Sequence, residues 1–171
     1  MKAFAVATAL LIAAAPVAAA DYSQELALME KVSDAGVRVV VVDDAVEPIC
    51  READGFYMPN KGEPILGICV KDDTWTDYNS MVLRHEVVHA IQDCRDDNPN
   101  SPEILAAGLT VNGAKVAADT LGINLGRLLA PYVASGADDH VLLLEAEAFV
   151  KGFGLSTSDI SEEFDRVCRE S

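Results

Sequence analysis

One stretch of this chain constrains its fold more than any other: residues 77–97 contain no glycine or proline and are rich in apolar side chains. The stretch begins among helix-capping residue types and ends before Asn98-Pro99, which predicts a single helix. Apolar residues occur on almost every face of that helix, so we expect it to run through the hydrophobic core. Three ionisable residues interrupt it in the run His85-Glu86-Val87-Val88-His89. Burying them is costly unless something compensates them.

The spacing of the two histidines indicates a metal ion as that compensation. His85 and His89 are four residues apart, so their imidazoles lie on the same face of a helix and can bind one ion. Glu86 is rotated away from that face but can still reach a water molecule beside the metal. Two imidazoles and one carboxylate leave a fourth position open on zinc, where water is activated for attack on a carbonyl. We therefore predict zinc as the cofactor and Glu86 as the general base.

Residues 82–91 (VLRHEVVHAI) resemble the extended signature of zincin metallopeptidases. The third metal ligand distinguishes the groups within that clan. The metzincin pattern requires a further histidine soon after His89, but residues 90–95 contain none. That group is therefore excluded, and the remaining common solution is a glutamate on a later helix, as in gluzincins.

Residues 138–151 contain two candidates for that glutamate. Glu145 and Glu147 lie in an otherwise apolar segment, where unpaired carboxylates would be costly. The run EAEA at 145–148 resembles the Glu-x-x-Ala motif of gluzincins related to thermolysin and the CAAX prenyl proteases, whose first glutamate binds zinc. The resemblance implies that Glu145 is the third ligand, and Glu147 is the rival, because residues two apart point to nearly opposite sides of a helix. Those families often place Asp or Asn four residues after the ligand, whereas this chain has Phe149, which leaves the partner of the ligand histidine unidentified.

The predicted fold class is α+β: a minimal zincin-like domain with a small antiparallel sheet packed on helices and the His-Glu-x-x-His helix at its centre. Residues 22–35 predict an amphipathic helix that ends at Gly36, with Leu26, Met29 and Val32 on one face. Further helices are predicted at residues 102–120, 123–134, 139–151 (closed by Gly152) and 158–170.

Three strands are expected before the central helix. The unbroken β-branched run at residues 38–44 predicts a strand buried on both faces. Residues 55–58 and 65–70 flank a turn-forming segment and predict a hairpin. If the strand at 65–70 lies at the edge of the sheet, an extended peptide could add to it as a further strand.

The first twenty residues predict export. Lys2 precedes an apolar run that ends on small residues at Ala18–Ala20, which is the layout of a cleaved signal peptide. The weakly hydrophobic alanines and Pro16 argue against a retained membrane anchor. We predict a signal peptide at 1–20 and one metallopeptidase domain at 21–171, secreted or periplasmic, with no stable membrane insertion after cleavage.

Four cysteines follow the predicted signal peptide, and an even number in an exported chain indicates disulfides. Their spacing lacks the close cysteine pairs of structural zinc sites. Cys50 and Cys69 lie near the predicted sheet and could bridge it, which would leave Cys94 to join Cys168. We therefore favour two disulfides.

The formal net charge of −15 argues against nucleic acid and anionic lipid surfaces as partners. The predicted function is a zinc-dependent endopeptidase, a hydrolase that cuts peptide or protein substrates with a zinc-activated water. One alternative is a non-catalytic, zinc-stabilised exported module that binds or inhibits a partner, although Glu86 argues against it because a structural site has no use for a base. Another is a zinc hydrolase acting on a cell-wall peptide cross-link. The sequence predicts no oligomeric state.

Five further side chains could serve the site or only the core. His140 and the tyrosines Tyr57, Tyr78 and Tyr132 are possible donors to the oxyanion of an intermediate. We interpret His140 as a residue in the first turn of its helix and the tyrosines as packing residues. Trp75, between the hairpin and the central helix, is interpreted as an anchor in the core. None of them is assigned to the catalytic site.

Overall fold

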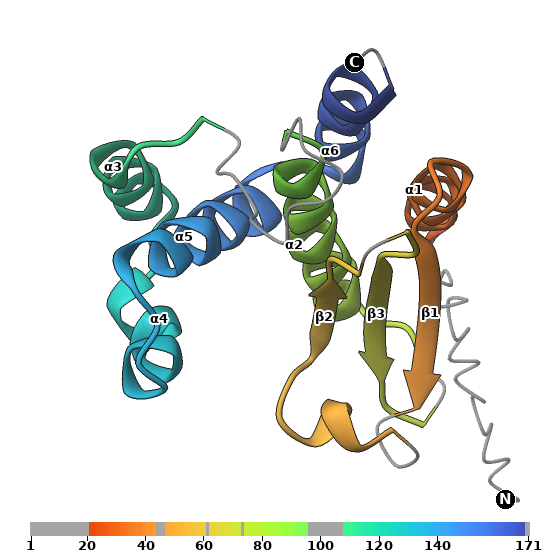
Figure 1. Ribbon diagram of the computed structural model, residues 1–171, viewed down its shortest axis with the longest axis horizontal. Coiled ribbons are helices and arrows are strands. Elements are labelled where there is room, and N and C mark those ends of the chain that lie inside the picture. Colours follow the sequence, from red (N-terminus) through yellow and green to blue (C-terminus); the bar gives the residue numbers. More distant parts are fainter. Residues whose placement is uncertain (1–20, 44–46, 61, 73, 96–107, 170–171) are drawn as a thin grey trace, which may run out of the picture.

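The computed structural model describes residues 21–43, 47–60, 62–72, 74–95 and 108–169. This part of the chain forms an α+β fold of six α-helices and one three-stranded sheet (Figure 1). The predicted signal peptide at 1–20 and the first residues of the helix predicted at 102–120 lie outside the described residues. No helix in the described ranges is both long and apolar enough to cross a membrane.

The sheet is mixed, which corrects the prediction of an antiparallel sheet. Its strand order is β1-β3-β2. β2 (Gly55–Met58) and β3 (Ile65–Val70) form the predicted antiparallel hairpin, whereas β1 (Arg38–Asp43) runs parallel to β3. β3 therefore lies between two strands that precede it in the chain. Hydrophobic patterns predicted the strands but carry no information on that insertion.

The most deeply buried strand is β3 and not β1. Leu66 to Val70 are all buried, because β3 has a neighbour on each side. β1 is an edge strand and is only partly covered, with Val41 48% exposed. The prediction that residues 38–44 are buried on both faces is therefore wrong. β3 is also not an edge, so a peptide cannot add to it; β2 is the edge strand that contacts α2.

The first helix, α1 (Ser23–Asp34), ends as predicted before Gly36, which has a φ of 93°. Its buried face is rotated relative to the predicted one, and Leu26 is 63% exposed. The buried residues are Glu25, Leu28 and Val32. Glu25 is tolerated there because the Thr157 hydroxyl, far along the chain, donates to its carboxylate at 2.8 Å.

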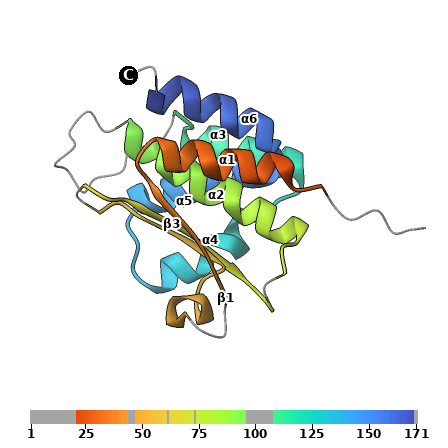
Figure 2. The same ribbon diagram turned by 90° about the vertical axis from the view of Figure 1, so that its right-hand side faces the viewer.

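The predicted central helix is α2 (Asp77–Cys94), and it begins with a capping box. The Thr76 hydroxyl accepts from the Asn79 N–H at 3.3 Å, and Asn79 Oδ1 accepts from the Thr76 N–H at 2.9 Å. α2 contacts β2 and β3 on one side and α5 on the other. Figure 2 shows α1, α2 and α6 on the same side of the sheet. Fully buried apolar residues of α2 form the middle of the core: Leu83, Val87, Val88 and Ile91.

The C-terminal half consists of helices packed around α2. They are α3 (Val111–Leu121), α4 (Leu125–Ala134), α5 (Asp139–Gly154) and α6 (Thr157–Phe164), followed by a π-helical turn at Asp165–Arg169. α5 packs against α2, and α3 and α4 pack against α5 (Figure 1). The prediction that this helix closes at Gly152 is wrong, since α5 continues to Gly154. Gly152 lies inside the helix, where α5 touches α2.

The two predicted disulfides are present, and they join the cysteines in the pairing that the sequence left as one possibility. Cys50–Cys69 connects the 3₁₀-helix η1 (Pro48–Arg51) to β3, and Cys94–Cys168 connects the end of α2 to the C-terminal turn. Both close long loops and so restrict the unfolded chain. The second one fixes the C-terminal end of the helix that carries the histidine motif.

Candidate metal centre

Helices α2 and α5 bring together His85, His89 and Glu145, the three residues predicted as metal ligands. His85 Nε2 and His89 Nε2 are 3.2 Å apart. Glu145 Oε2 lies 3.4 Å from the first and 3.6 Å from the second. Their side chains are only 10–14% exposed. The group could hold a metal ion.

The triangle of ligand atoms fits one face of a coordination tetrahedron. Ligands about 2.0–2.1 Å from a tetrahedral ion are about 3.3–3.4 Å from one another, close to the separations of 3.2, 3.4 and 3.6 Å. Glu145 Oε2 is also buried without a hydrogen-bond partner among the described residues. Such an atom is costly unless a cation compensates it. Imidazole and carboxylate donors are typical ligands of divalent transition metals.

Close approach of α5 to α2 makes this meeting possible. A Cβ on Gly152 would lie 3.1 Å from both the amide nitrogen and the Cβ of His85. A larger residue there would push the two helices apart. The Phe149 ring, one turn earlier on α5, packs against the His85 imidazole with centroids 4.5 Å apart. Phe149 thus orients His85 by packing.

Glu147 lies on another side of α5 and is not part of the metal group. Its side chain is fully buried, with an exposed fraction of 0%. One of its oxygens accepts from the Leu109 N–H at 3.0 Å, and the other accepts from Gln92 Nε2 at 3.0 Å. The structure therefore places Glu145, and not Glu147, beside the two histidines.

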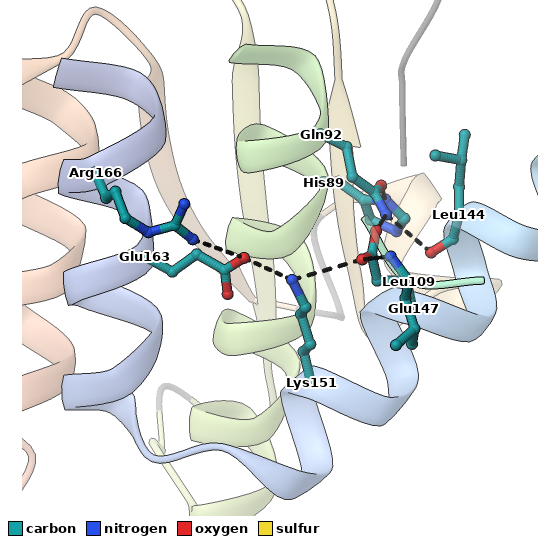
Figure 3. Close-up of polar contacts among 8 residues, drawn as sticks. All are labelled: His89, Gln92, Leu109, Leu144, Glu147, Lys151, Glu163 and Arg166. Carbon is teal, nitrogen blue, oxygen red and sulfur yellow. Dashed lines mark hydrogen bonds and ion pairs between the residues drawn. The ribbon is translucent and has the colours of Figure 1, made fainter. Parts of the chain in front are cut away.

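Gln92 contacts His89 and was not considered in the sequence analysis. Its Oε1 lies 2.8 Å from His89 Nδ1 (Figure 3). Gln92 is fully buried, and its amide nitrogen also donates to the Leu144 carbonyl at 3.1 Å. The signal that could have found it is its position three residues after His89, on the same face of α2.

The charges of the group act strongly on one another. Burial disfavours the charged form of His89, but the adjacent Glu145 carboxylate outweighs burial and raises the pKa of His89 to about 9. Burial likewise opposes the ionisation of Glu145, but its contacts with the two imidazoles hold its pKa well below the usual range. Burial raises the pKa of Glu86, although the charges of the histidines oppose that rise. Glu145 is thus ionised beside the histidines.

The metal group opens on a cleft of about 640 Å³, and both His85 and Glu86 line it. Glu86 is 6% exposed. One wall comes from the segment of η1 and β2, with the acidic side chains Glu52 and Asp54. The opposite wall comes from α4 and α5 and is mainly apolar: Leu128, Pro131, Phe149 and Phe153.

Tyr132 of α4 also lines this cleft, although the sequence analysis interpreted it as a packing residue. Burial, followed by the charge of Glu145 and a hydrogen bond to it, raises the pKa of Tyr132 above its usual range. The Tyr57 hydroxyl donates instead to Asp93 at 2.6 Å. His140 is exposed in the first turn of α5. Tyr132, which lines the cleft and whose pKa responds to the charge of Glu145, is therefore the candidate donor at this site.

Tyr78 and Trp75 have structural roles, and a second, larger groove contains none of the proposed metal ligands. The Tyr78 hydroxyl donates to Asp54 at 2.5 Å. Trp75 packs against the core and donates to Ser80 Oγ at 3.0 Å, in agreement with its interpretation as an anchor. A larger groove of about 800 Å³ between α3, α4 and α5 is mainly apolar and is lined by no residue of the metal group. The smaller cleft is therefore the site with reactive side chains.

Comparisons of the chain with protein-family models, curated proteins and solved structures find no match. Its function must therefore be inferred from the geometry and chemistry of the site. Those features are the ligand group, the glutamate beside it and the cleft on which both open.

Proposed function

We propose that this protein is a zinc-dependent endopeptidase of the gluzincin type, exported after cleavage of residues 1–20. The observation that carries the proposal is the meeting of His85, His89 and Glu145 at separations that fit one tetrahedral ion. The α+β fold with the motif helix through its core is compatible with a minimal zincin-like domain. The two disulfides are compatible with a protein that works outside the cytoplasm.

In this proposal His85 and His89 bind zinc through Nε2, and Glu145 binds it through Oε2. Bound zinc would polarise the carbonyl of the scissile peptide bond and make water a stronger nucleophile near neutral pH. Three protein ligands are the number found in catalytic zinc sites, whereas structural sites usually have four. The set therefore favours a catalytic role over a purely structural one.

Glu86 is the general base. It follows His85 on α2, is nearly buried, and lines the cleft in which a substrate would lie. Its carboxylate takes a proton from the attacking water and transfers it to the nitrogen of the departing amine. The carboxylate is regenerated, so one water is consumed for each peptide bond that is cut.

The edge strand β2 is the proposed place for an extended substrate. β2 pairs with β3 on one side and contacts α2. Gly55, its first residue, lies close to the base, since an added Cβ would be 2.9 Å from Glu86 Oε1. A peptide that adds to this strand would therefore pass the base and the metal group.

A digest of a mixed peptide library tests this function. The wild-type protein, prepared with one equivalent of zinc, should cut internal peptide bonds, as detected by mass spectrometry. A chelator should stop cleavage, and added zinc should restore it. The proposal fails if the zinc-loaded protein leaves every peptide intact, and that outcome would favour the non-catalytic module.

A further inference from the structure

Gln92 and Glu147 form a buried polar chain behind His89. We propose that this chain positions His89 by imposing the tautomer that carries its proton on Nδ1 and leaves Nε2 free for the metal. Both are then positioning residues, because they act through His89. The inference rests on the metal-binding part of the proposed function and does not depend on which substrate is cut.

The chain is defined by three contacts of the Gln92 side-chain amide (Figure 3). Its nitrogen lies 3.0 Å from Glu147 Oε2 and 3.1 Å from the Leu144 carbonyl oxygen. Its oxygen lies 2.8 Å from His89 Nδ1. Gln92 and Glu147 are both 0% exposed, so water does not compete for these contacts.

The donor and acceptor chemistry of the amide determines the direction of each bond. The Leu144 carbonyl can only accept, so the Gln92 amino group must face it, and the second hydrogen of that group is donated to Glu147 Oε2. The amide oxygen is then the atom that faces His89, and it too can only accept. His89 Nδ1 must therefore carry a proton. In a neutral imidazole this leaves the lone pair on Nε2, the atom that points to His85 and Glu145.

Donors also surround the other oxygen of Glu147. Glu147 Oε1 accepts from the Leu109 N–H at 3.0 Å and lies 3.5 Å from Lys151 Nζ. Lys151 in turn donates to Glu163 at 2.6 Å (Figure 3). A buried carboxylate needs such partners to remain charged. The chain thus extends from a charged pair between α5 and α6 to the metal group.

Position distinguishes this arrangement from the pattern that the sequence resembles. In that pattern, a polar residue four positions after the ligand glutamate holds the histidine, but this protein has Phe149 at that position. Here the hydrogen-bond acceptor comes from α2 itself, one turn after His89. Glu147 supports it from α5. An outer residue of this kind typically contributes about 10- to 100-fold in metal affinity.

Replacing Glu147 by glutamine tests the inference. The Leu109 N–H and Lys151 both require an acceptor, so the oxygen of the new amide should face them and its amino group should face Gln92. Gln92 then cannot satisfy all of its neighbours, because the new amino group requires the Gln92 oxygen whereas the Leu144 carbonyl still requires the Gln92 amino group. Its hydrogen bond with His89 Nδ1 should therefore be weakened. We expect E147Q to bind zinc about 10- to 100-fold more weakly than wild type. In the zinc-loaded variant, nitrogen NMR of labelled histidine should show a His89 Nδ1–H proton that exchanges faster than in wild type.

Two further variants separate positioning from a general structural effect. The exchange Q92E/E147Q returns an acceptor to His89 Nδ1 and should bind zinc more tightly than E147Q alone. Q92M removes the acceptor for His89 Nδ1 but leaves the contacts of Glu147 with Leu109 and Lys151 in place. It should also weaken zinc binding, and it replaces E147Q as the test if E147Q does not fold. Glu162→Gln is the matched control, because it removes an exposed carboxylate of α6 and should bind zinc as wild type does.

The outcomes distinguish this inference from the proposed function. Wild-type zinc affinity and an unchanged Nδ1–H signal in folded E147Q and Q92M would overturn the positioning role and leave the metal site intact. Wild-type protein that binds no zinc would overturn the metal site itself, and the inference with it. Weak binding by E147Q with recovery in the exchanged pair would support the inference.

Discussion

Ionisable side chains buried in apolar helices are the residues that define this site. His85, Glu86 and His89 are each less than 9% exposed, and Glu145 meets the two histidines from another helix. Burial of that many titratable groups is costly in a domain whose net stability is about 5–15 kcal/mol. The arrangement is therefore more readily explained by a bound cation than by packing alone.

Tyr132 of α4 is the candidate side chain for stabilising charge on a bound substrate. Its hydroxyl lies in the cleft beside Glu145, where it could donate to the negatively charged oxygen that develops on the substrate carbonyl. We expect Tyr132→Phe to lower kcat about 100-fold with little change in KM. Steady-state kinetics on a peptide identified by the library digest would measure this.

Tyr78→Phe is the matched control, since Tyr78 also lines the cleft but donates to Asp54. Its kcat should stay near that of wild type. If Tyr132→Phe instead weakens zinc binding and retains kcat at saturating zinc, Tyr132 orients Glu145 and is not the donor.

The site residues that could be predicted are those that form a motif within a short stretch of the sequence. His85, Glu86 and His89 form a motif within one helix, so their grouping was evident. The choice of Glu145 over Glu147 as the third ligand could not be decided from residue types. Both lie in the same apolar helix, and the rotation of that helix is set by its packing against α2. Gln92 and Tyr132 were missed as site residues, since glutamine and tyrosine at those positions follow no pattern that separates them from packing residues.

At the scale of elements, the contact between α2 and α5 determines the site. Each helix contributes part of the metal group, and Gly152 lies where they touch. The sequence analysis interpreted Gly152 as the end of a helix, which is the commoner use of glycine at such a position. Its role in close packing could not be predicted, because it depends on which helix faces α5.

A methyl group at this contact gives the second prediction. The Cβ of Gly152→Ala would lie 3.1–3.2 Å from backbone atoms of His85, which cannot move independently of α2. We expect the free energy of unfolding to fall by about 1–3 kcal/mol. Zinc affinity should fall too, because Glu145 moves with α5. Chemical denaturation and zinc titration would measure both quantities.

Gly126→Ala is the matched control on α4. An added Cβ there meets no atom closer than 3.5 Å, and this glycine is exposed. Alanine should leave stability unchanged or raise it by up to about 1 kcal/mol, since it favours helix more than glycine does. Stability and zinc affinity of Gly152→Ala equal to those of wild type would show that the close contact has no energetic role.

The sheet illustrates a second limit at this scale. The β-branched run of β1 predicted a strand buried on both faces, yet β1 is at the edge and β3 is central. Residue types indicate that a segment prefers to be a buried strand. The position of that strand in the sheet depends on which strands it pairs with, which is not a local property of the sequence. The hairpin of β2 and β3 was predictable because its turn is local.

At the scale of the whole molecule, two disulfides and one continuous core hold the helices on the sheet. The sequence favoured two disulfides and left their pairing open, because which cysteines meet depends on the fold; Cys50 joins Cys69, and Cys94 joins Cys168. The α+β class also follows from the order of apolar patterns. The mixed direction of the strands did not, because it depends on non-local pairing.

Hydrogen bonds between tyrosines and carboxylates predict how the folded protein responds to alkaline pH. Burial and the nearby Asp93 carboxylate raise the pKa of Tyr57 above the ordinary value of 10.0, and burial with Asp54 raises that of Tyr78 to about 12. The folded state therefore retains these protons more strongly than the unfolded chain. This stabilisation is fully present below pH 10 and is lost as pH rises through the folded-state pKa.

A spectrophotometric titration of tyrosinate tests that prediction. The main absorbance change should occur above pH 10, and the free energy of unfolding should fall over the same range. Tyr57→Phe should lose less stability there than wild type. Titration of all tyrosines at the ordinary value while the protein is still folded would contradict the described contacts.

We propose that the group of His85, His89 and Glu145 holds zinc for peptide hydrolysis, with Glu86 as the base. A comparison of wild type with Glu86→Gln tests this claim when bound zinc and the rate of peptide cleavage are measured in the same samples. Both proteins should bind one zinc per chain, and the variant should cut about 10²- to 10⁴-fold more slowly. Cleavage by Glu86→Gln at the wild-type rate, or one bound zinc with no cleavage by wild type, would contradict the claim.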